Sequence, residues 1–80
     1  MNNRTKLLAI MGELFGVDPS SLSDASSPDT LEAWDSMGGI ELSAQLEREF
    51  KVKFGLLELD ELRTVGIIIE SLREKGVDLD

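Results

Sequence analysis

The sequence predicts an all-α protein, a small antiparallel four-helix bundle with a long first loop and a short third helix. Apolar residues recur at helical spacing in three stretches, near residues 7–15, 40–50 and 65–72. This pattern is typical of amphipathic helices that bury one face in a shared core. Residues suited to begin or end a helix flank these stretches. The chain has 80 residues, so we expect a single domain over residues 1–80.

The first helix is expected from about Asn3 to Phe15. Its apolar stripe most simply buries one helix face in the core, and it comprises Leu7, Ile10, Met11 and Leu14, with Leu8 and Phe15 beside them. Gly16 follows directly and is suited to end the helix in the left-handed conformation.

A long connection over residues 17–34 comes next. Asp18 followed by Pro19 predicts a single helical turn, with the aspartate as its cap. The rest is rich in turn-forming residues, and loops of this length in compact domains are usually functional or anchored. We expect Leu22 and Leu31 to anchor this one.

The second helix is predicted from Ser36 to about Phe50. Asp35 is a good N-cap, because its carboxylate accepts from free backbone N–H groups and suits the positive end of the helix dipole. Gly38 and Gly39 cost about 1 kcal/mol each relative to alanine, so the first turn should be soft. We favour the interpretation that these small residues permit close approach by a partner or a prosthetic arm.

The third and fourth helices are shorter. Residues 56–62 contain four leucines but lack a polar cap, so we expect a weakly formed helix with one or two leucines exposed. Thr64 caps a fourth helix, which runs from about Val65 to Lys75 and ends at Gly76. Its buried stripe comprises Val65, Ile68, Ile69 and Leu72.

Composition restricts the possible functions. The formal charge is −8, from 16 acidic and 8 basic residues, which disfavours nucleic acid or anionic membranes as partners and favours basic protein surfaces. The chain lacks both histidine and cysteine, so it has neither the commonest general base nor a thiol of its own. We find no targeting segment and no membrane span, and expect a cytoplasmic monomer.

The centre of the chain resembles a known modification site. Asp35-Ser36-Met37, followed by Ile40-Glu41-Leu42 and Leu46-Glu47-Arg48-Glu49-Phe50, is similar to the second helix of acyl carrier proteins. Residues 64–72 are similar to the last helix of that family, so the resemblance covers nearly the whole chain. It implies that Ser36 receives 4′-phosphopantetheine from coenzyme A through a separate phosphopantetheinyl transferase. Asp35 would act only as the helix cap beside this site.

The resemblance implies a carrier and not an enzyme. Its arm would hold acyl groups as thioesters and pass them between partners of a fatty-acid, polyketide or related biosynthetic pathway. Two alternatives stay open: an aminoacyl or peptidyl carrier of a nonribosomal-peptide-type pathway, and a helical interaction module that is never modified. We expect no metal site, because the acidic residues of the third helix lack the spacing of an EF-hand loop.

Two further groups of residues are candidates for function. The resemblance implies a shallow apolar patch with acidic neighbours for acyl-loading ligases or synthases with basic docking surfaces, formed by Met37, Ile40, Ala44, Glu41, Glu47 and Glu49. Trp34 either anchors the loop to the bundle or contacts a partner enzyme beside Ser36. An interior acyl-chain pocket would be lined by Met11, Phe54, Leu59 and Leu62, and a methionine favours such adaptable packing.

Overall fold

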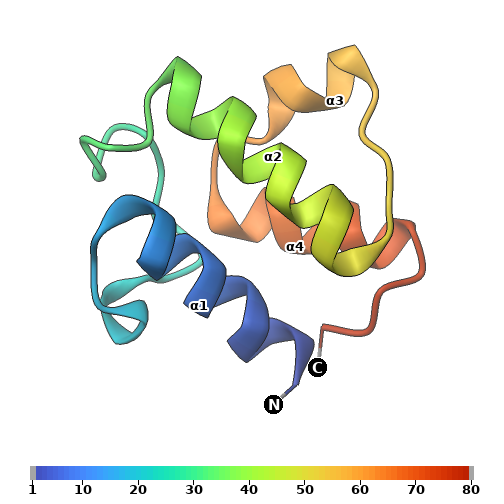
Figure 1. Cartoon of the computed structure of the whole chain (residues 1–80), viewed down its shortest axis with the longest axis horizontal. Helices are drawn as coiled ribbons and strands as arrows, with labels where there is room; N and C mark the ends of the chain where they lie inside the picture. Colours follow the sequence, from blue (N-terminus) through green and yellow to red (C-terminus); the bar gives the residue numbers. More distant parts are fainter. Residues whose placement is uncertain (1, 80) are drawn as a thin grey trace.

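The computed structural model of the protein describes residues 2–79, and every regular secondary-structure element in this range is helical. The elements are α1 (Asn3–Phe15), the 3-10 turn η1 (Pro19–Ser21), α2 (Ser36–Phe50), α3 (Leu56–Glu61) and α4 (Val65–Glu74). α1 runs antiparallel to α2, and α4 runs behind α2 in the same general direction (Figure 1). The predicted all-α fold, with its long first loop and short third helix, is confirmed.

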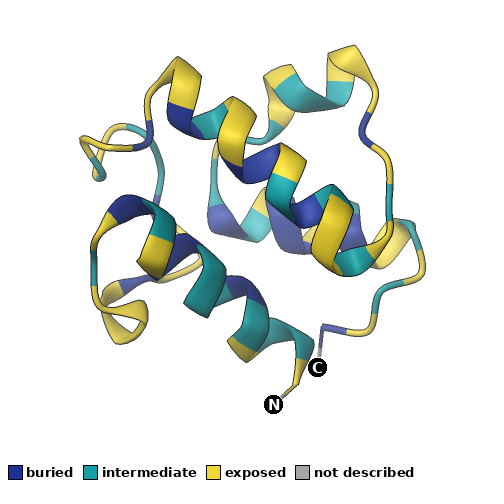
Figure 2. Ribbon diagram, in the orientation of Figure 1, coloured by how far each residue is buried: buried dark blue, intermediate teal, exposed yellow. Residues whose placement is uncertain are grey.

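The core lies between the inward faces of α1, α2 and α4 (Figure 2). Its largest fully buried side chains come from these three helices and from the C-terminal segment, and they are Leu7, Met11, Leu42, Leu46, Val65, Ile68, Leu72 and Leu79. The two ends of the described chain meet, because the Asn3 side chain donates a 2.8 Å hydrogen bond to the Asp78 carbonyl. The apolar side chains of the core contribute about 1.5–3 kcal/mol each when they are fully buried.

The helix ends follow the predicted chemistry. Gly16 takes the left-handed conformation, with φ of 70°, and ends α1. Asp18 accepts from the Ser20 amide at the start of η1. Thr64 accepts from the Ile67 amide and so caps α4. The cap of α1, Asn2, was not predicted, although it accepts from the Thr5 amide at 2.8 Å.

Backbone hydrogen bonds fix the long loop against the start of α4. The carbonyls of Asp24 and Ser26 accept from the amides of Gly66 and Val65, at 2.9 and 3.1 Å. These amides belong to the first turn of a helix and have no partner within it, so the loop satisfies them. Arg4 adds an ion pair to Asp24 at 2.7 Å. The loop is therefore attached to the bundle at more points than the two leucines that the sequence suggested.

The missing cap of α3 is replaced from within the helix. The Glu58 side chain accepts from the Gly55 amide at 2.9 Å, which is the N3 half of a capping box. Leu56 and Leu57 are 86% and 82% exposed, as expected for two of the four leucines. α3 thus lies on the surface of the bundle, with a polar attachment and two exposed leucines.

Candidate functional site

Ser36 is the first residue of α2 and is exposed. Its hydroxyl makes no hydrogen bond to any residue in the range 2–79 that the structure describes. The Asp35 carboxylate beside it accepts from the Gly38 amide at 2.8 Å, as predicted for an N-cap. The hydroxyl therefore lies on the surface at a capped helix start, with no partner among the described residues.

Gly38 serves the packing beneath this serine. Gly38 is buried, and a Cβ at this position would lie 2.4 Å from the Ala33 carbonyl oxygen and 3.2 Å from Cε1 of Phe15. The interpretation that Gly38 admits a partner is wrong, because the molecule's own loop occupies that space. At Gly39 a Cβ would meet only Trp34, at ordinary contact distance of 3.7 Å.

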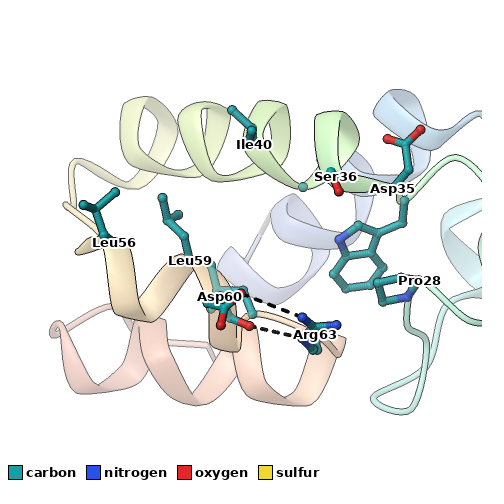
Figure 3. Close-up of a pocket in the computed structure, with 11 residues that line it drawn as sticks. Pro28, Asp35, Ser36, Ile40, Leu56, Leu59, Asp60 and Arg63 are labelled. Carbon is teal, nitrogen blue, oxygen red and sulfur yellow. Dashed lines mark hydrogen bonds and ion pairs between the residues drawn. The ribbon is translucent and has the colours of Figure 1, made fainter.

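A groove of about 570 Å³ opens beside Ser36 between the start of α2 and α3. Its lining is mainly apolar, from Trp34, Ile40, Leu56, Leu59, Leu62 and Pro28, and its charged residues are Asp35 and the ion pair of Asp60 with Arg63. Leu56 and Leu59 point from α3 toward α2, and Ser36 lies at the start of the helix opposite (Figure 3). Concave sites with apolar walls and few polar groups are the usual form of ligand pockets.

Trp34 closes the base of the site. It is only 2% exposed and stacks on Phe15, with ring centroids 5.6 Å apart and planes 19° from parallel. Such a pair adds stability beyond the buried area. Of its two proposed roles, the geometry supports loop anchoring and contradicts contact with a partner enzyme, because almost none of the ring reaches the surface.

The outer face of α2 carries four of the predicted partner residues. Met37 and Ile40 are 66% and 61% exposed, and Glu41 and Ala44 are exposed beside them. Their spacing of three and four residues places them in one stripe. The stripe begins one residue after Ser36, so a molecule that reached the serine would meet it.

The two other glutamates make contacts within the chain. Glu47 turns inward, and its Oε2 accepts from the Phe54 amide at 2.8 Å. This bond holds the segment after α2, so Glu47 has a structural role, and its contact with a partner stays a prediction. Glu49 forms a 3.5 Å ion pair with Lys6 of α1 but keeps an exposed carboxylate.

The predicted acyl-pocket residues separate into two places. Leu59 and Leu62 line the groove beside Ser36. Met11 is completely buried in the core, and Phe54 is 8% exposed with the Lys75 ammonium 5.3 Å from its ring centroid. The four residues do not line one groove in this structure, so an interior pocket that opens to take up an acyl chain stays a prediction.

Several groove residues had not been predicted. Pro28 comes from the long loop, and Asp60 and Arg63 come from the end of α3 and the segment after it. The long loop and α3 reach the start of α2 only through tertiary packing, so local patterns could not have shown these three residues. The sequence contained one indication of the groove: one or two leucines of residues 56–62 were expected to be exposed, and Leu56 is exposed and lines it.

No helix within residues 2–79 is both long enough and apolar enough to span a membrane. A small helical bundle with an exposed serine at the start of its second helix has the architecture of a carrier domain. Comparison with protein families agrees: residues 5–72 match the family described as the phosphopantetheine attachment site. The chain belongs to this family, and its prosthetic group is 4′-phosphopantetheine. Such carrier domains are typically non-catalytic and interact with transferase and synthase partners.

Proposed function

We propose that the protein is an acyl carrier protein in which Ser36 bears the 4′-phosphopantetheine group. The observation that supports this most is the position of Ser36, an unengaged hydroxyl at the capped start of α2, on the edge of an apolar groove. The residues present fit the group: Ser36 provides the oxygen for the phosphodiester, and Ile40 and Leu59 offer apolar surface to the arm. When bound, the group supplies a terminal thiol that carries acyl cargo as thioesters.

Ser36 acts as a substrate of the attachment reaction. The chain has no histidine, and the Asp35 carboxylate is engaged by the Gly38 amide. The transferase must therefore supply the base that removes the serine proton. Ser36 Oγ attacks the β-phosphorus of coenzyme A, and the bond to the adenosine 3′,5′-bisphosphate leaving group breaks.

We further propose the stripe of Met37, Ile40, Glu41 and Ala44 as the contact surface for the transferase and for acyl-loading enzymes. The stripe is exposed and continuous with Ser36. The charge of −8 favours partners with basic docking surfaces, which it attracts over a distance. A tethered cargo then meets each partner at a high effective concentration set by the reach of the arm.

The proposal is tested with the purified protein, coenzyme A, Mg²⁺ and a phosphopantetheinyl transferase, followed by intact mass measurement. We expect a gain of one phosphopantetheine per chain. Ser36→Ala should gain nothing, and Ser21→Ala, which removes an exposed serine from η1, should gain the full mass. A wild-type protein that stays unmodified would support the unmodified interaction module instead.

The same assay extends to the cargo. Modified protein is offered to acyl-loading and aminoacyl-loading ligases in separate reactions. The largely apolar lining of the groove supports acyl cargo. Loading of amino acids alone would contradict this choice and identify an aminoacyl carrier.

A further inference from the structure

The groove beside Ser36 contains a polar group that the described residues leave without a partner. Trp34 is 2% exposed, and its indole Nε1–H has no acceptor among residues 2–79. Trp34 lines the groove, and its nitrogen faces the start of α2 near Gly39. The nitrogen is not among the fully buried unpartnered atoms of the described residues, so it can be reached from the groove and can donate to an occupant there.

Gly39 keeps this donor accessible. A Cβ at position 39 would lie 3.7 Å from Nε1 and 3.9 Å from Cδ1 of Trp34, in ordinary contact. A methyl group would therefore fit without a clash and would cover the N–H edge of the ring. The glycine is not required by packing at this position, in contrast to Gly38.

The charged side chains that line the groove have partners within the chain. Asp35 accepts from the Gly38 amide. Arg63 donates to the Asp60 carbonyl at 3.1 Å and lies 3.8 Å from the Asp60 carboxylate. An occupant that enters from Ser36 therefore meets apolar walls and, among them, the indole N–H of Trp34, which has no partner in the described residues.

We propose that Trp34 is a positioning residue for the prosthetic arm: its indole N–H donates a hydrogen bond to an amide carbonyl of the 4′-phosphopantetheine attached to Ser36. This inference rests on the proposed function. The arm has the complementary chemistry, since it carries amide carbonyls as acceptors and methyl groups that suit the walls formed by Ile40 and Leu59. A single hydrogen bond contributes little net free energy, so the arm can leave the groove again when a partner enzyme binds.

Nuclear magnetic resonance tests this directly, because the chain has one tryptophan and therefore one indole N–H signal. Spectra of ¹⁵N-labelled protein are compared before and after modification, with the modification of Ser36 verified by intact mass. We expect the indole proton to move downfield and to exchange with water roughly fivefold more slowly, as for one net hydrogen bond. An indole signal that is unchanged in fully modified protein overturns the inference. Failure to gain mass would instead overturn the proposed function.

Gly39→Ala is the sharpest variant, because its methyl group should shield the indole N–H without removing it. We expect this variant to accept the arm in the mass assay, but to lose the downfield change of the indole proton. Gly55→Ala is the matched control, since φ at Gly55 is −76° and its Cβ would meet only Glu58, at 3.8 Å. A full indole response in Gly39→Ala would contradict the inference.

A second variant observes the arm itself. Trp34→Phe removes the donor while it keeps an aromatic ring to stack on Phe15. With the arm attached from isotopically labelled coenzyme A, its amide groups should be more mobile in this variant than in the wild type. Equal mobility in the two proteins would overturn the inference.

Discussion

The Glu58 carboxylate of α3 lies 2.8 Å from the Lys75 ammonium at the end of α4. The same carboxylate accepts from the Gly55 amide and from the Ser71 hydroxyl, at 2.9 and 3.2 Å. One side chain thus both completes the first turn of α3 and joins α3 to α4. Because α3 forms one wall of the groove beside Ser36, this contact also fixes the shape of the groove.

These contacts make the docking of α3 depend on pH. The hydrogen bond from the Gly55 amide, followed by that from Lys75, lowers the pKa of Glu58 below its ordinary value of 4.5. A carboxyl whose pKa is lower in the folded state adds stability that is complete above the unfolded value and is lost as the pH falls through the folded value. We therefore expect amide protection in α3 to fall below about pH 4.5.

Glu58→Gln tests this dependence by hydrogen exchange of the α3 amides. The variant should show weaker protection already at pH 7 and a smaller further loss in acid. Glu61→Gln makes the same charge change at an exposed position of the same helix and should behave as the wild type. Identical acid profiles for wild type and Glu58→Gln would contradict the role of Glu58.

Gly38 and Gly39 should respond in opposite directions to alanine. At Gly38 the new methyl group would overlap the Ala33 carbonyl, a backbone atom that cannot turn aside, so we expect a loss of about 1–3 kcal/mol. At Gly39 there is room, and better helix propensity should stabilise the unmodified protein by up to about 1 kcal/mol. Denaturant unfolding of both variants measures the difference. Equal stability of the two variants would show that the loop at Ala33 moves aside to accommodate the methyl group.

These two glycines illustrate what the sequence could predict. The helices, their caps at Asp18, Asp35 and Thr64, and the exposed serine follow from local rules, because each depends on residues close together in the chain. The requirement for glycine at position 38 does not follow from local rules, since it depends on how the preceding loop packs against α2.

The same limit applies to the candidate site. The family resemblance predicted Met37 and Ile40 as parts of a surface patch, and both side chains are exposed. It could not show that Glu47 would turn toward Phe54, because that bond depends on the conformation of the chain after α2. The groove likewise combines a loop, the start of α2 and one side of α3 with the segment after it, and only tertiary packing brings these together.

Glu47 should matter for folding, in contrast to its neighbour Glu49. Glu47→Ala leaves the Phe54 amide, which is partly buried, without its acceptor and should cost at least about 1 kcal/mol. Glu49→Ala removes only an exposed ion pair with Lys6, worth about 0–1 kcal/mol. Thermal unfolding compares the two variants, and hydrogen exchange at Phe54 identifies the bond responsible. If Glu49→Ala proved the more destabilising, Glu47 would not have the structural role assigned here.

Ile40 provides the cleanest test of the proposed contact surface. Its side chain is 61% exposed, so Ile40→Ala should change stability by no more than about 0.5 kcal/mol. If a transferase buries this side chain, truncation should cost more than about 1 kcal/mol of binding and slow attachment of the arm at least roughly fivefold. Ile67→Ala, at an exposed isoleucine of α4, is the control and should react at the wild-type rate. The rates are measured by intact mass over time at limiting carrier concentration. Equal rates for wild type and both variants would place the contact surface elsewhere on the molecule.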